Sequence, residues 1–204
     1  MPDTMSLRLR LSGTGCCALV LIACGGGNPL DNPPQVTNAP QPGGQHLSYA
    51  YFQRCVMPIL EAPLPVRIGG NTAVNSCASG GCHDDRNGTG GALRLRGGAA
   101  PADLASAAAN AEQVRTTDMY RNFYSAQGEV VFGDALASRL IAKPLVLNVL
   151  HGGGIVFDSV DDPNLRVLRY WIEHPMPQGH DEFSRAGDGL FTPADATTGH
   201  CNTD

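Results

Sequence analysis

The chain has 204 residues, an apolar fraction of 42% and a formal net charge of −5 at pH 7. This length fits one domain with an extension, and its 25 glycines and 15 prolines indicate that much of that domain is loop. The acidic balance argues against a nucleic-acid partner, because phosphates require a basic surface.

The N-terminus has the pattern of an export signal. Arg8 and Arg10 precede an apolar run, residues 16–23, which is too short to span a bilayer and has the length of a signal-peptide core. Residues 21–24 (LIAC) resemble a bacterial lipobox, which predicts cleavage before Cys24 and a lipid on its thiol. An ordinary cleaved signal peptide and an uncleaved anchor are the alternatives.

Three regions follow from this interpretation. Residues 1–23 are the predicted lipoprotein signal peptide, residues 24–45 a tether rich in glycine, proline and asparagine, and residues 46–204 the folded domain. Gly25, rather than aspartate, follows the lipidated cysteine. In Gram-negative lipoproteins, a residue other than aspartate at this position resembles the pattern that directs the protein to the outer membrane. We therefore expect an exported protein held by its lipid at the outer membrane, facing the periplasm or the cell surface.

Helical patterns dominate the folded domain. A first apolar face (Leu47, Tyr51, Cys55, Ile59) predicts a helix that ends around Pro58. After a long loop, further helices are expected over residues 101–115, 118–125 and 134–142.

The last predicted helix has the clearest signals. Asp161 or Asp162 can cap it, Pro163 suits its first turn, and Pro175 stops it. Its apolar stripe consists of Leu165, Leu168, Trp171 and Ile172. Because no segment shows a convincing alternating strand pattern, we predict an all-α fold with long loops.

The most informative motif is Cys77-Ala-Ser-Gly-Gly-Cys82-His83. Two cysteines with a histidine directly after the second are typical of a covalently attached haem c: each thiol adds to one vinyl group and the imidazole ligates the iron. The usual gap between the cysteines is two residues, and here it is four small ones. The alternatives are a small disulfide and a zinc site, although no second Cys-x-x-Cys or His-x-x-x-His pair supplies a fourth zinc ligand.

Several segments together resemble the planctomycete-type cytochrome c domain. The similar segments are residues 51–60 (YFQRCVMPIL), 90–95 (GGALRL), 133–140 (GDALASRL) and 168–172 (LRYWI), which follow the order of that family around the haem motif. The resemblance implies a cytochrome c-like fold, one covalent haem c on Cys77 and Cys82, and His83 as the proximal iron ligand. It also implies electron transfer between redox protein partners, without enzymatic catalysis.

The second axial ligand is expected in the loop before the last helix. Many members of the wider class have a methionine there, whereas this chain has His151 followed by three glycines. We predict that His151 is the distal ligand, with Met119 as the alternative.

The remaining cysteines and the missing motifs complete the predictions. Cys16 and Cys17 would leave with the signal peptide, Cys24 would take lipid, and two cysteines would take haem. Cys55 and Cys201 are then left to form a disulfide in an oxidising compartment. There is no Gly-x-Ser-x-Gly or His-Glu-x-x-His motif. Two alternatives stay open: a haem-free, disulfide-stapled structural or binding lipoprotein, and a haem-based sensor or peroxidase with an open distal position.

Overall fold

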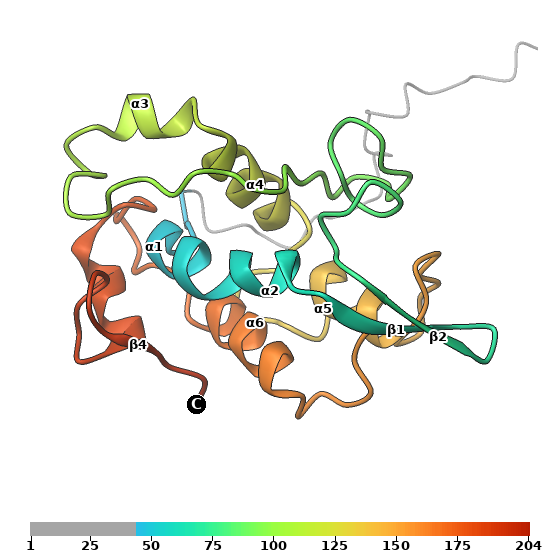
Figure 1. Cartoon of the computed structure of the whole chain (residues 1–204). Coiled ribbons are helices and arrows are strands. Elements are labelled where there is room, and N and C mark those ends of the chain that lie inside the picture. Colours follow the sequence, from blue (N-terminus) through green and yellow to red (C-terminus); the bar gives the residue numbers. More distant parts are fainter. Residues whose placement is uncertain (1–43) are drawn as a thin grey trace, which may run out of the picture. The chain divides into compact units, whose positions relative to one another are not determined.

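The computed structural model describes residues 44–204 (Figure 1). The predicted signal peptide, the lipidation site Cys24 and the tether up to residue 43 lie outside the described residues. In residues 44–204, no helix combines the length and the apolar character needed to cross a membrane.

The first helix continues through the proline that was expected to end it. It consists of α1 (Tyr49–Tyr51), a wider π-helical turn η1 (Phe52–Val56) and α2 (Met57–Glu61). Pro58 lies in the first turn of α2, where a missing backbone N–H is tolerated. The Ser48 side chain caps the N-terminus by accepting a hydrogen bond from the Tyr51 N–H.

The last helix packs against the first and forms the centre of the core. As predicted, α6 (Pro163–Glu173) begins after Asp162, whose carboxylate accepts hydrogen bonds from the backbone of its first turn. Trp171 is fully buried and donates its indole N–H to the Ser48 carbonyl oxygen. Phe52 and Phe123 pack on its ring, with centroids 5.4 and 6.1 Å away.

The middle of the chain is less helical than predicted. The structure has α3 (Ala111–Arg115), α4 (Asp118–Gln127) and α5 (Arg139–Leu145). Residues 101–110 are mostly turn. The Asp103 carboxylate accepts hydrogen bonds from the Ala105 N–H and the Ser106 hydroxyl. The Gln53 side-chain amide accepts a hydrogen bond from the Ala102 N–H and donates one to the Ala102 carbonyl oxygen.

The prediction of an all-α fold was wrong. Of the described residues, 32% are helical and 12% are in extended pairs, including two small antiparallel sheets. One is the hairpin of β1 (Leu64–Ile68) and β2 (Asn71–Asn75); the other joins β3 (Phe191–Thr192), which follows the 3-10 helix η2 (Arg185–Leu190), to β4 (His200–Cys201).

The hairpin had a recognisable sequence signal. Leu64, Val66 and Ile68 alternate with other residues, and Gly69-Gly70 forms a two-residue turn in which both glycines have positive φ. Glycine is favoured in such a turn because it has no Cβ to clash in the left-handed region. These residues were instead interpreted as loop.

A disulfide ties the C-terminal segment to the first helix. Cys55 in η1 and Cys201 in β4 are joined, with Cα atoms 6.1 Å apart and a sequence separation of 146. In the chain-entropy model a closed loop of this length stabilises the fold by about 4–5 kcal/mol, through restriction of the unfolded chain.

A buried carboxylate fixes the same segment to α3 and α4. Glu182 is 2% exposed, and its Oε1 accepts hydrogen bonds from Arg115 Nε at 3.0 Å and from the Tyr120 hydroxyl at 2.8 Å. Burial alone would raise the pKa of Glu182, but the hydrogen bonds from Arg115 and Tyr120 outweigh it and hold that pKa below its ordinary value of 4.5.

Glu182→Gln is therefore expected to lower the free energy of unfolding at pH 7 by about 1.5–3 kcal/mol, the contribution of hydrogen bonds to a charged group. A depressed pKa adds stability above the unfolded-state value and loses it as pH falls through the folded-state value, so the loss should begin below about pH 4.5. Urea unfolding at pH 7 and pH 3.5 measures both effects. The exposed Glu112→Gln is the control, and an equal response of the two variants would contradict the prediction.

Candidate functional site

The loop from Cys77 to His83 forms a compact turn that presents the histidine. The Cys82 N–H donates to the Ser79 carbonyl at 3.0 Å, and the His83 N–H donates to the Cys77 carbonyl at 2.9 Å. These bonds coil the four-residue gap back on itself. The Ala78 N–H donates to the carbonyl of Leu60 at the end of α2, which anchors the turn to the first helix.

The residues after the motif hold the His83 ring. Its Nδ1 lies 3.1 Å from the Leu93 carbonyl oxygen, so an Nδ1–H donates there and Nε2 is left free of a proton. Gly90 lies directly against the ring: a Cβ at this position would be 2.4 Å from His83 Nδ1. Burial lowers the pKa of His83, and the nearby His151 acts in the same direction, which favours the neutral imidazole that ligates metals.

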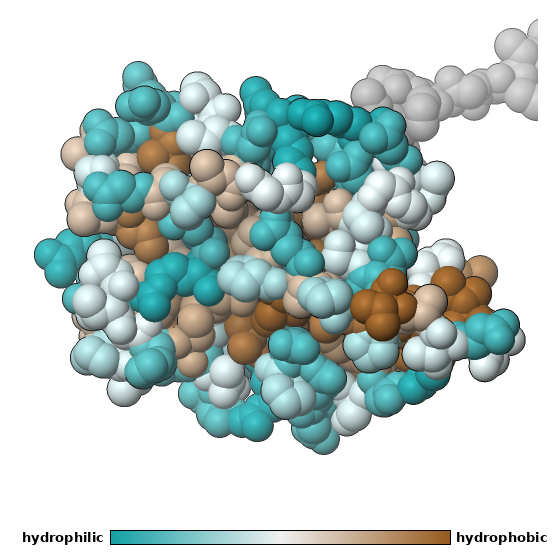
Figure 2. Space-filling view, in the orientation of Figure 1, coloured by the Kyte–Doolittle hydropathy of each residue, from teal (hydrophilic) through white to brown (hydrophobic). Residues whose placement is uncertain are grey.

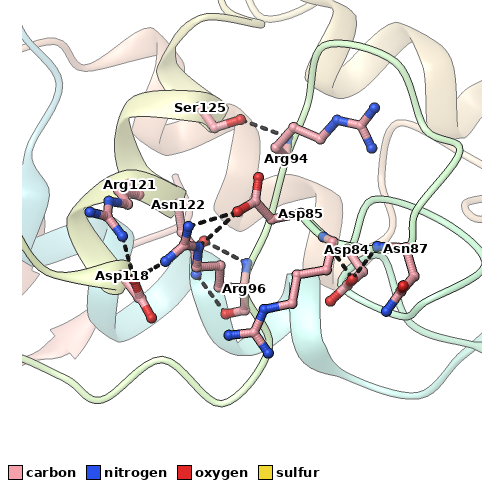
Figure 3. Close-up of polar contacts among 10 residues, drawn as sticks. Asp84, Asp85, Asn87, Arg94, Arg96, Asp118, Arg121, Asn122 and Ser125 are labelled. Carbon is pink, nitrogen blue, oxygen red and sulfur yellow. Dashed lines mark hydrogen bonds and ion pairs between the residues drawn. The ribbon is translucent and has the colours of Figure 1, made fainter.

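Helix α4 supports this arrangement from behind. Leu95 pairs with the chain just after the motif, through Leu95 N–H to His83 O at 2.7 Å and Asp85 N–H to Leu95 O at 2.8 Å. Ser125 and Asn122 of α4 accept hydrogen bonds from the neighbouring backbone N–H groups of Arg94 and Arg96, as Figure 3 shows. The backbone of the motif is therefore fixed to a regular element.

Ion pairs also join the segment after the motif to the start of α4. Arg96 bridges Asp85, next to the motif, and Asp118 at the start of α4, and Asp118 also pairs with Arg121 (Figure 3). The carboxylate of Asp84 accepts hydrogen bonds from the backbone N–H groups of Arg86 and Asn87. These aspartates therefore stabilise a turn and a loop.

The β1–β2 hairpin positions His151. Ile155 and Arg67 of β1 exchange two backbone hydrogen bonds of 2.9 Å each. Gly154 has φ +83°, and a Cβ there would be 2.2 Å from the Arg67 carbonyl oxygen, so only glycine allows this approach. The His151 Nδ1 lies 2.7 Å from the Gly154 carbonyl oxygen, which orients the ring in the same way as Leu93 orients His83.

The two histidines, 68 positions apart in the chain, face one another across a narrow gap. Their ring centres are 6.1 Å apart and the ring planes differ by 13°. Two imidazole–metal bonds of about 2.0–2.1 Å, with about 1 Å from each ligating nitrogen to its ring centre, give about 6 Å between the centres of trans imidazoles. The observed distance between the ring centres agrees with this value.

Two cavities meet at this pair. Both are lined by Cys77, His83, Gly90, Lys143 and His151, and they contain about 620 and 1130 Å³ of space with their mouths included. The volume open to the centre of a water molecule is about 60 Å³ in the smaller cavity and about 370 Å³ in the larger, so only the larger one reaches the range of about 300–1,000 Å³ that is usual for cofactor sites. Most other lining side chains are apolar: Ile59, Leu60, Leu93, Leu140, Phe157 and Leu168 in the smaller cavity, and Leu64, Val66, Ile68 and Val156 in the larger.

Exposed apolar side chains lie on the hairpin and on the loop after α5. Ile68 is 54% exposed and lines the larger cavity, while Val74 of the hairpin and Leu147 and Leu150 of the loop after α5 are also exposed. Figure 2 shows apolar surface on the side where Figure 1 places the hairpin. Grouped exposed apolar residues of this kind are typical of interaction surfaces.

The two cysteines of the motif form no disulfide with each other and belong to no zinc-binding group within residues 44–204. Cys77 and Cys82 are both free thiols. Burial, followed by the proximity of Cys82, raises the pKa of Cys77 to about 11, so it is a protonated thiol at neutral pH. Across residues 44–204, no three His, Cys, Asp or Glu side chains are grouped closely enough to hold a metal ion by themselves, which gives a zinc site no geometric support.

Met119, the alternative distal ligand, lies elsewhere. It is 4% exposed within the hydrophobic core and lines neither cavity. His174 stacks on Tyr170 and is likewise absent from both linings. Of the residues proposed from sequence, the structure therefore brings together Cys77, Cys82, His83 and His151.

Comparisons of the chain with protein-family models, curated proteins and solved structures found no match. The resemblance described above therefore remains a sequence-based hypothesis.

Three supporting features were not recognised from sequence. They are the Leu93 carbonyl, the close approach of Gly90 to His83, and the pairing of Arg67 with Ile155. Every residue has a backbone carbonyl, so the residue types do not indicate which carbonyl orients a ring. The Gly69-Gly70 turn was the available sequence signal for the hairpin. Gly90, seven residues after His83, was a weak signal for the close approach of the backbone to the His83 ring.

Proposed function

We propose that this protein is a single-haem c-type cytochrome that carries electrons between redox protein partners outside the cytoplasm. The observation that carries the proposal is the juxtaposition of His83 and His151 beside two free cysteines. On the basis of the N-terminal sequence, we also propose that a lipid on Cys24 anchors the protein to the membrane. We propose no nucleic-acid partner, because the chain is acidic.

The residues present fit a covalent haem. A covalent haem c would need two thiols beside the histidine that ligates its iron, and largely apolar walls. Cys77 and Cys82 border the larger cavity together with both histidines, and each imidazole is oriented by a carbonyl on Nδ1 so that Nε2 is available. Most of the other lining side chains are apolar.

When bound, haem supplies an iron that cycles between two oxidation states. The residues of this chain keep the geometry constant during that cycle. Leu93 and Gly154 fix the two imidazole orientations, α4 fixes the backbone behind His83, and the hairpin fixes the His151 loop. Ligation by two imidazoles lowers the reduction potential relative to ligation by histidine and methionine. The exposed apolar residues of the hairpin and of the loop after α5 offer redox partners a surface from which water is easily removed.

Two other functions remain as alternatives. A haem-based sensor or peroxidase needs an open distal position, and the place of His151 opposite His83 favours an electron carrier instead. A haem-free binding lipoprotein would use the same apolar cavities for another ligand.

Spectra of the full-length protein, produced in cells that mature haem c, distinguish these functions. A Soret band, a sharp α-band on reduction and no change with carbon monoxide are expected for the electron carrier. Carbon monoxide binding by the reduced wild type would favour the sensor or peroxidase. A protein without visible absorption would support the haem-free alternative and contradict the proposal.

A further inference from the structure

Two cations on α5 line the smaller cavity without a partner. Arg139 and Lys143 are four residues apart and so lie on one face of the helix. Neither forms an ion pair or a side-chain hydrogen bond within residues 44–204. Among the arginines of this part of the chain, only Arg86 shares that property; the others each contact a carboxylate or a carbonyl oxygen.

The cavity has an excess of positive charge. Lys143 is half-buried and borders both cavities, and its charge contributes to the lowered pKa of His83. Glu129 is the one carboxylate among the residues that line the two cavities, and it forms no ion pair with either cation. Because a half-buried cation without a counter-charge is unfavourable, this arrangement favours an anionic ligand.

Only one cation and one thiol are confined to different cavities. Arg139 lines the smaller cavity alone, and Cys82 lines the larger one alone. Cys77 and Lys143 line both, as the two histidines do. A haem carries its vinyl groups and its two propionate carboxylates on different parts of its edge.

We propose that Arg139 and Lys143 bind the propionate carboxylates of the haem and thereby set which edge of the macrocycle faces α5. This inference rests on the proposed function. Arginine suits the task because its guanidinium can donate two parallel hydrogen bonds to one carboxylate, and lysine adds a second positive charge one turn away. The pairing would keep both propionates ionised across the neutral range.

The test compares the wild type with Arg139→Gln, Lys143→Gln and the double variant, using the full-length protein. The mass of each denatured protein reports covalent haem, and the midpoint potential is measured from pH 5 to pH 9. Each substitution removes positive charge near the iron, so the ferric state should be favoured about three- to tenfold, and tenfold corresponds to about 59 mV.

The pH profile separates propionate binding from a general charge effect. Without its cation a propionate binds a proton more readily, so a new rise in potential should appear as pH falls through the range from 8 to 5, and it should persist when Glu129→Gln is added. Arg86→Gln, which removes an unpaired arginine that lines neither cavity, should add no such step. Arg139→Lys keeps the positive charge, so its midpoint potential should depend on pH as in the wild type. This conservative variant also keeps the test usable when the double variant does not fold.

The outcomes are distinct. Wild-type protein without covalent haem would overturn the proposed function and this inference with it. A loaded wild type whose pH profile equals that of the double variant would overturn this inference alone, as would a new step that disappears with Glu129→Gln.

Discussion

Replacing His151 with alanine is expected to leave the haem attached and to open its sixth coordination position. Cys77, Cys82 and His83 are held by contacts that do not involve the His151 side chain, so attachment should continue. The ferric spectrum should change from six-coordinate low-spin to high-spin, and the reduced variant should bind carbon monoxide. The midpoint potential should rise by at least about 59 mV, a tenfold change in the electron-transfer equilibrium, because an electron-donating imidazole is lost.

His174→Ala is the matched control. Its ring nitrogen also lies close to a backbone carbonyl, that of Tyr170 at 2.9 Å, but it lines neither cavity. It should keep the wild-type spectrum and potential. If His151→Ala also kept the low-spin spectrum and the same potential, His151 would not be the ligand, and Met119 would be the next residue to replace.

Replacing Gly90 with alanine is expected to disturb the proximal side of the site. The added methyl group would lie 2.4 Å from His83 Nδ1 and 2.7 Å from the Cys82 carbonyl oxygen. Because one of these neighbours is backbone and the other a ring held by Leu93, neither yields cheaply. A stability loss of about 1–3 kcal/mol is expected from overpacking, together with a large fall in covalent haem content.

Gly80→Ala is the control for that substitution. Gly80 lies in the loop between Cys77 and His83, lines neither cavity and has open space around its added Cβ. Urea unfolding and the ratio of haem absorbance to protein should be close to wild type for Gly80→Ala and clearly reduced for Gly90→Ala. Equal values for the two variants would show that Gly90 does not restrain His83.

The sequence was informative where structure is decided locally. The last helix was predicted with a cap at Asp161 or Asp162, of which Asp162 is the cap, with Pro163 in its first turn and with Trp171 in its apolar stripe. Capping, proline and an apolar stripe act within a few residues. The Cys77–His83 motif is also local, and its residues lie together in one turn.

The errors have two physical causes. A π-helical turn before Pro58 shifts the backbone hydrogen bonds, so the proline starts a helical turn instead of ending the helix. The β1–β2 hairpin was overlooked because proline at position 65 and the polar Asn71–Asn75 strand dilute the alternating pattern around the Gly-Gly turn.

The geometry of the candidate site depends on contacts that are distant in sequence. The position of His151 before the last helix suggested a ligand, but its approach to His83 depends on the pairing of Ile155 with Arg67, 88 residues earlier. The carbonyls that orient the two rings belong to Leu93 and Gly154, whose side chains carry no sign of that role. The sequence also does not indicate that Arg139 and Lys143 line a cavity without forming an ion pair, because this depends on the tertiary structure.

The mass of the denatured mature protein tests the central hypothesis most directly. Full-length protein from cells that mature haem c should carry the added mass of one haem after denaturation, because thioether bonds to Cys77 and Cys82 survive unfolding. A double Cys77→Ser, Cys82→Ser variant from the same cells should lack that mass. An unmodified polypeptide mass for the wild type would contradict the proposal that this chain is a c-type cytochrome.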